Sequence, residues 1–256
     1  MSPATGTIDD VIEKLTAVIH ECRRIESPIG YFAALYRRIT IAVKQAIAAR
    51  QFDDNERMER IDVTFASRYL DALEQYRSGA QPTMPWAIAF RAARYSSPLV
   101  FQHLLLGVNA HVNLDLGIAV AEVCPGTALA GVRNDFFRLN ALLGGQVDTV
   151  RRELSEICFL LRWTALLGRP EDRLVSLAVD LGRDHAWGIA QRLAAASPAE
   201  QPAVIQQAEA EAARLANDIR SPGLLLGLLF RLIRLTERGT VARKIDFLVA
   251  RGPAAH

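Results

Sequence analysis

The chain has 256 residues, of which 50% are hydrophobic and 23% charged, and its 30 basic and 28 acidic side chains leave a net charge of +2. This composition is typical of a globular protein with enough length to bury a core, and it argues against a disordered chain. Because so small a net charge creates no strong basic field, nucleic acid is not expected as a partner.

Three widely spaced cysteines, Cys22, Cys124 and Cys158, form no CxxC pair. Their spacing argues against a cysteine zinc site and favours reduced thiols. The N-terminus shows no basic start followed by an apolar run, so no signal peptide is expected. The most apolar segment, residues 222–234, is interrupted by two arginines and falls short of the roughly 18 apolar residues that a spanning helix needs. It is expected to form a buried helix, and a helix on a membrane surface is the alternative. We therefore expect a cytoplasmic protein without a transmembrane segment.

Apolar residues recur at spacings of three and four along almost the whole chain, which predicts helices and no strands. In the first half, helices are expected over residues 8–25, 31–49, 56–76, 84–94 and 98–124. In the second half, they are expected over residues 134–167 with a break at the glycines 144–145, and over 170–195, 200–219, 222–236 and from 241 onward. The pattern predicts an all-α, compact single-domain bundle of about eight to ten helices over residues 1–256. The best candidate for a domain boundary is the segment 197–202.

One stretch, HLLLGVNAHVNLDLG, which begins at His103, places polar side chains in an otherwise apolar helix. At about 100° per residue, His103, His111 and Asp115 share one stripe, whereas Asn109 and Asn113 lie on a second, roughly opposite stripe. Other helices are therefore expected to surround this helix and bury its polar groups, which then need partners. The two asparagines are predicted either to bind substrate or to hydrogen-bond groups on neighbouring helices.

His111 and Asp115 are four residues apart, so their side chains reach the same point beside the helix. A neutral imidazole and a carboxylate at that spacing are predicted to bind a divalent metal ion. His103 lies about 12 Å away along the axis, so it would serve a second site unless Gly107 permits a kink. The alternative is a hydrogen-bonded pair without metal, with His103 packed in the core.

Asp62 has apolar neighbours and is expected to face inward, either as a further carboxylate of the site or as the partner of Arg68 or another arginine. Asn134 and Asp135 are predicted either as substrate contacts at a helix start or as the cap of that helix. Asn140 lies inside an apolar run, where a polar residue is less easily explained. Dinucleotide-binding, P-loop, HExxH and GxSxG motifs are absent from the sequence, which excludes the corresponding enzyme classes as leading candidates.

The stretch QHLLLGVNAHVNLDLG, which begins at Gln102, resembles the signature of a bacterial family catalogued only as a domain of unknown function. The stretch MERIDVTFASRY at residues 58–69, and residues 134–136 with Asn140, fit the same pattern. The resemblance covers roughly residues 28–240. It implies an all-helical fold and no established activity.

A second and weaker resemblance is to the zinc-dependent phospholipases C and the related single-strand nucleases. They are all-helical and carry H-x-x-x-D and H-x-x-x-E ligand pairs, and in this chain only His111 and Asp115 match. This resemblance implies that a metal site with its ligands on a helix is physically reasonable in such a fold.

The leading prediction is a metal-dependent enzyme whose divalent ion activates water, with hydrolysis of a phosphate or other ester as the reaction. The predicted site residues are Asp62 and His103 as catalytic groups, His111 and Asp115 as metal ligands, and Asn109, Asn113, Asn134 and Asp135 as substrate contacts. The alternative is a non-catalytic protein that binds a small molecule or lipid in a largely apolar pocket. A third hypothesis is a bundle that forms a homo-oligomer through residues 222–236.

Overall fold

The structure, a computed structural model, describes residues 6–157 and 184–250, without the side chains at 146–148, 150–157 and 225–226. Within these ranges every regular element is a helix and no strand occurs. The predicted all-α bundle is therefore confirmed. The parts of the predicted helices that fall on residues 158–183 lie outside the described residues.

The first half of the chain forms four helices that lead to a long central one. They are α1 (Ile8–Arg24), α2 (Ile29–Ala48), α3 (Asn55–Ser78) and α4 (Met84–Ala92). The central helix is continuous but changes its winding, so that it comprises α5 (Val100–Ala110), the π-helical turn η1 (His111–Asp115) and α6 (Leu116–Val123).

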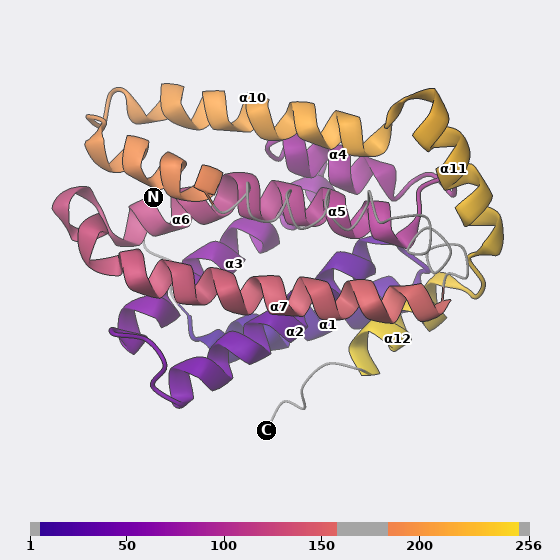
Figure 1. The fold of residues 1–256 in the computed structure, drawn as a ribbon, viewed down its shortest axis with the longest axis horizontal. Coiled ribbons are helices and arrows are strands. Elements are labelled where there is room, and N and C mark those ends of the chain that lie inside the picture. Colours follow the sequence, from indigo (N-terminus) through magenta and orange to yellow (C-terminus); the bar gives the residue numbers. More distant parts are fainter. Residues whose placement is uncertain (1–5, 158–183, 251–256) are drawn as a thin grey trace.

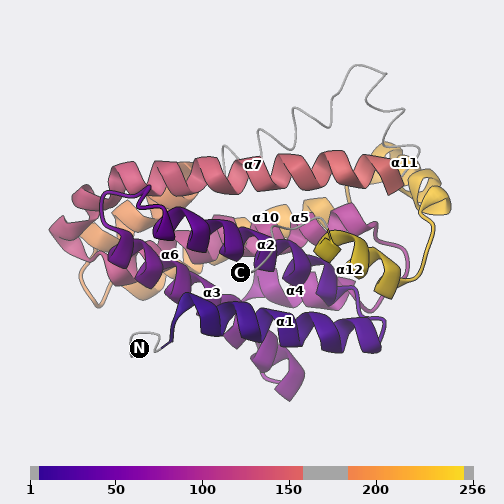
Figure 2. The ribbon, with the colours of Figure 1, turned by 90° about the horizontal axis from the view of Figure 1, so that it is seen from below.

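After the central helix, the chain continues in helices joined by short connections. They are the 3₁₀ helix η2 (Gly126–Val132), α7 (Arg133–Ile157), a helix at residues 184–195, α10 (Gln201–Arg220), α11 (Gly223–Thr236) and α12 (Val241–Ala250). In Figure 1, α10 runs along one long edge of the molecule above α4 and α5, and α11 closes one end. Seen from below, α7 extends along the bundle beside α2, with α1 on the far side of α2 (Figure 2).

Local signals in the sequence account for several helix ends. Thr7 and Asp10 form a capping box at the start of α1, in which each side chain accepts the backbone N–H of the other. Asp54 caps α3 by accepting the N–H of Arg57, and Gly79 ends that helix with a φ of 81°. These residues are the ones that such positions favour, because they satisfy the free backbone groups of the first turn or adopt a left-handed backbone.

Helix α7 does not break at residues 144–145, so the predicted break is wrong. Each glycine in a helix costs about 1 kcal/mol relative to alanine. Leu139 and Leu143, on the same helix, are 2% and 7% exposed and belong to the main hydrophobic core. Burial of such leucines offsets the glycine cost, so tertiary packing outweighs the local preference.

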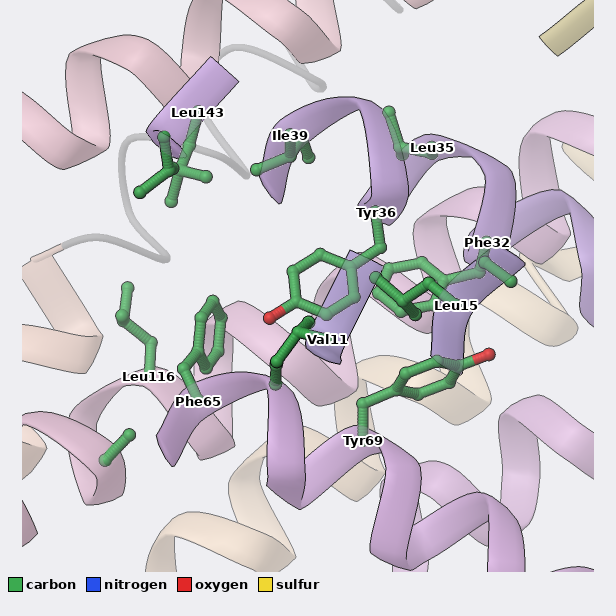
Figure 3. Close-up of a cluster of buried hydrophobic side chains, with 14 of the residues drawn as sticks. Val11, Leu15, Phe32, Leu35, Tyr36, Ile39, Phe65, Tyr69, Leu116 and Leu143 are labelled. Atoms are coloured by element: carbon green, nitrogen blue, oxygen red, sulfur yellow. The ribbon is translucent and has the colours of Figure 1, made fainter. Parts of the chain in front are cut away.

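Most of the core is one cluster to which α1, α2, α3, the central helix and α7 contribute. Figure 3 shows part of it, with Tyr36 and Tyr69 at its centre and their hydroxyl oxygens directed to opposite sides. The central helix contacts α2, α3, α4 and α10, so other helices surround it. The stretch Val100–Val123 is long and apolar enough to cross a membrane by length and composition alone, but 78% of its most apolar window is buried inside the bundle. That burial is typical of a core helix.

Candidate functional site

His111, 2% exposed, lies in the middle of the bundle within a cage of aromatic rings. Its imidazole stacks on Phe65, with ring centroids 3.5 Å apart and an angle of 6° between the rings. Tyr36 meets the imidazole edge-on, with centroids 4.3 Å apart. The cage is completed, at centroid distances of 5.7 to 6.3 Å, by Phe32, Trp86 and Tyr69. Three helices, α2, α3 and α4, thus supply the surroundings of one histidine.

The carboxylate of Asp115, 1% exposed, is held by two strong donors. Arg68 Nε donates to Oδ1 at 2.9 Å, and Trp86 Nε1 donates to Oδ2 at 2.7 Å. Arg68 also lies 3.6 Å from a carboxylate oxygen of Glu122. Arg68 therefore contacts Asp115 rather than Asp62, and each Asp115 oxygen has a donor from the protein itself. Such charge-assisted hydrogen bonds are what a buried carboxylate requires.

The residues between His111 and Asp115 form a π-helical turn, in which the N–H of Leu116 donates to the carbonyl of His111. Single π-helical turns inside α-helices are frequent at functional sites. Here the turn leaves His111 Nδ1 3.5 Å from Asp115 Oδ2, a distance at the outer limit of a hydrogen bond. Neither ring nitrogen of His111 makes a hydrogen bond to any part of the chain that the structure describes.

Tyr36 and Asp62 add two more polar groups to this neighbourhood. Tyr36 Oη and Asp62 Oδ2 are buried and make no hydrogen bond within the described ranges. In Figure 3 the Tyr36 oxygen is directed to the side on which Phe65 lies. Asp62, three residues before Phe65 on α3, is near enough for its charge to act on the Tyr36 phenol. We call the group formed by Tyr36, Asp62 and His111 the central polar cluster.

Burial governs the protonation of the central polar cluster. It lowers the pKa of His111, against the opposing effect of Asp115, so the imidazole is neutral at pH 7. Burial, assisted by the charge of Glu59, raises the pKa of Asp62 to about 7. Burial, followed by the charges of Asp62 and Asp115, raises the pKa of the Tyr36 phenol well above its ordinary value. The cluster can therefore donate and accept hydrogen bonds, and Asp62 can take up or release a proton near neutral pH.

His103 lies apart from this cluster. Its ring packs on Tyr31 at a centroid distance of 5.8 Å, and burial lowers its pKa to about 4. The helix stays α-helical through Gly107, where an added Cβ would come within 2.3 Å of the Phe32 ring. Gly107 thus permits close packing of α5 on α2, and no kink brings His103 to His111.

Asn109 and Asn113 face the other side of the central helix. Asn109 Nδ2 donates to the carbonyl of Ala212 at 2.8 Å, and Asn113 Nδ2 donates to Asn109 Oδ1 at 2.8 Å. Gln102 extends this row by donating to the carbonyl of Ile219 at 3.0 Å. Asn109 and Gln102 thus tie the central helix to α10, which matches the interpretation that Asn109 bonds a neighbouring helix, whereas Asn113 bonds Asn109 within the central helix.

Asp135 joins the start of α7 to the loop before α3. Its fully buried carboxylate accepts the two backbone N–H groups of residues 53–54 at 2.7 and 3.1 Å. Arg138 and Arg57 donate to the same carboxylate at 3.0 and 3.4 Å. Asn134, beside it in the first turn of α7, is exposed. The four contacts of Asp135 account for its burial without a ligand.

Sequence reasoning did not assign Arg68, Trp86 or Tyr36 to the site. The available signal was the indole N–H of Trp86, since a buried indole finds a hydrogen-bond acceptor. The side-chain amide of Asn140, 1% exposed, makes no hydrogen bond to the described residues.

Among the described residues, no group of three or more His, Cys, Asp and Glu side chains is placed to hold a metal ion. The predicted metal site thus stays a prediction that rests on one His–Asp pair.

Comparison with known protein families matches residues 8–222 to a family of unknown function (DUF5995). The chain belongs to this family. The matched residues run from α1 to α10 and include the central polar cluster and all the predicted site residues. The resemblance to a domain-of-unknown-function family is therefore confirmed, with no activity attached to it. No curated protein and no solved structure matches the chain.

Proposed function

We propose that this protein binds a small uncharged molecule through the central polar cluster. The observation that carries the proposal is the burial of polar atoms without hydrogen bonds. Tyr36, His111 and Asp62 are 1%, 2% and 3% exposed, and each has a polar atom that makes no hydrogen bond of ordinary geometry to the described residues. Each buried group of this kind costs about 1 to 3 kcal/mol. A ligand that supplies the partners would recover this free energy on binding.

The charges of the central polar cluster and the apolar residues around it indicate the class of ligand. The imidazole of His111 is neutral, and the charge of Asp115 is balanced by Arg68 at 2.9 Å. This arrangement offers an anion such as a phosphate no excess positive charge, because a buried charge needs a counter-charge. The aromatic rings packed around His111 give these polar atoms largely apolar surroundings. We therefore propose a ligand with hydroxyl or carbonyl groups on an apolar skeleton.

A metal-dependent hydrolase is the second candidate. It is supported by the approach of His111 Nδ1 to Asp115 Oδ2 at 3.5 Å, the i, i+4 pair that the sequence predicts. A divalent ion at this pair would polarise an ester or activate water. It would also have to displace Arg68 or Trp86 from the carboxylate. For this reason we rank it below ligand binding.

The test uses the full chain purified without a histidine tag. Native and denaturing mass spectrometry would be compared for a co-purifying organic molecule, and the metal content would be measured by inductively coupled plasma mass spectrometry. We expect about one equivalent of an organic ligand, as for a single buried site, and its loss in Tyr36→Phe. Tyr69→Phe is the matched control, because its hydroxyl is also buried without a hydrogen bond in the described chain but is directed to the opposite side (Figure 3).

The outcomes separate the two candidates. Equal ligand content in Tyr36→Phe and Tyr69→Phe would contradict the proposed role of the cluster. If the purified protein carries no ligand, a melting-temperature screen with uncharged hydroxyl and carbonyl compounds follows, and a screen without any stabilising compound rejects ligand binding. A stoichiometric metal that is lost in Asp115→Asn would favour the hydrolase instead.

We also propose that the protein acts in the cytoplasm. The buried thiols of Cys22 and Cys124 are free, which supports a reducing compartment. Cell fractionation tests this location. Self-association through residues 222–236 stays a prediction. The segment has four exposed leucines, which a second copy of the chain could contact.

A further inference from the structure

Helix α11 presents a row of leucines to solvent, so the prediction of a buried helix is wrong for this face. Leu224, Leu228, Leu232 and Leu235 are 94%, 58%, 49% and 82% exposed. At the α-helical repeat they fall within an arc of about 80°, so they form one face rather than scattered positions. Ile233, on the opposite face, is 1% exposed and packs on Leu99. The helix is thus attached to the bundle by one side, while none of the residues that the structure describes covers its row of leucines, and an exposed apolar face of this kind marks interaction sites.

Basic residues lie at one edge of this leucine face and just beyond both ends of the helix. Arg231 is exposed and lies about 20° from Leu224 around the helix axis. Arg220 and Arg238, just before and just after α11, are exposed as well. The helix itself contains no acidic residue. The carboxylate of Glu237 is 7% exposed and turned inward, where it accepts from Lys244 at 3.1 Å and from the backbone of Val100 at 3.0 Å.

The geometry points to an anionic lipid surface as the partner of the leucine face. An interfacial helix buries leucines at the boundary of the acyl chains while arginines reach the anionic headgroups. A second copy fits less well, because a two-fold contact between these faces would bring Arg231 towards its own symmetry mate. In Figure 1, α11 lies at one outer end of the bundle. This surface is separate from the central polar cluster.

The test is sedimentation of the full chain with vesicles of phosphatidylcholine, with and without phosphatidylserine. We expect binding only to the anionic vesicles, and weaker binding as salt screens the arginines. Leu228→Glu/Leu235→Glu should abolish it. Ile25→Glu/Tyr95→Glu is the matched control, since these residues are 52% and 62% exposed and lie outside α11. The control should bind as the unchanged protein does, and circular dichroism should confirm that both variants are folded.

A single charge change gives a graded result. Arg231→Gln is expected to weaken binding to anionic vesicles about fivefold, the effect of one basic side chain near an anionic surface. Absence of binding to anionic vesicles, or equal binding by the Leu228→Glu/Leu235→Glu variant, would overturn the proposal. Light scattering after size-exclusion chromatography measures whether the chain forms a dimer. A dimer that dissociates in the leucine variant, together with no vesicle binding, would identify a second copy as the partner and would also overturn it.

Discussion

Replacing Asp62 by asparagine removes a titratable group from the interior while it nearly preserves the shape of the side chain. The carboxyl group is fully buried, and its pKa is raised from the ordinary 3.8 to about 7. Since one pKa unit corresponds to about 1.4 kcal/mol, holding Asp62 ionised in the folded protein costs on the order of 4 kcal/mol.

The direction of the pH effect follows from the raised pKa. The folded protein binds the Asp62 proton up to about pH 7, whereas the unfolded chain releases it near pH 3.8. The free energy of unfolding contributed by Asp62 therefore falls as the pH rises from about 4 to about 7, and it changes little above that range. Asparagine does not titrate. We expect Asp62→Asn to gain stability relative to the unchanged protein by about 1.4 kcal/mol per pH unit in this window, with a plateau at higher pH.

The assay is urea unfolding of both proteins at a series of pH values from 5 to 9, flanking the raised pKa of about 7. The difference between the two free energies of unfolding is the quantity of interest. His103 titrates in the opposite sense, because burial lowers its pKa to about 4, and this effect cancels in the difference. Asp71→Asn, at an exposed position of the same helix, controls for the loss of one carboxylate. A difference that stays constant across the series would refute the reasoning, because Asp62 would then be ionised and have a partner.

Three further substitutions, two near the site and one in α7, test the packing of the bundle, each by urea unfolding. Trp86→Phe removes the donor to Asp115 Oδ2 and should lower the free energy of unfolding by about 1.5 to 3 kcal/mol; no loss would mean that this hydrogen bond adds no net stability. Gly107→Ala places a methyl group 2.3 Å from the Phe32 ring and should cost about 1 to 3 kcal/mol. Gly145→Ala meets no atom within 4 Å and should instead stabilise α7 by about 0.5 to 1 kcal/mol, so equal effects of the two alanines would contradict the packing argument.

The sequence predicted the site only in part. It identified His111, Asp115 and Asp62 as buried polar residues, and the structure buries all three. It also placed His103 on the same stripe, which is correct for a helical wheel but leaves the two histidines about 12 Å apart along the axis. Membership of a stripe states which face a residue occupies, not which residues meet.

Sequence alone determined the elements that local physics controls. Helical periodicity and the caps at Thr7 and Asp54 depend on residues close together in the chain. Only the tertiary structure decided that Arg68 meets Asp115, that Asn109 meets α10, and that α7 continues through its glycines. These choices depend on where helices distant in sequence cross, and crossing positions arise from packing summed over the whole core.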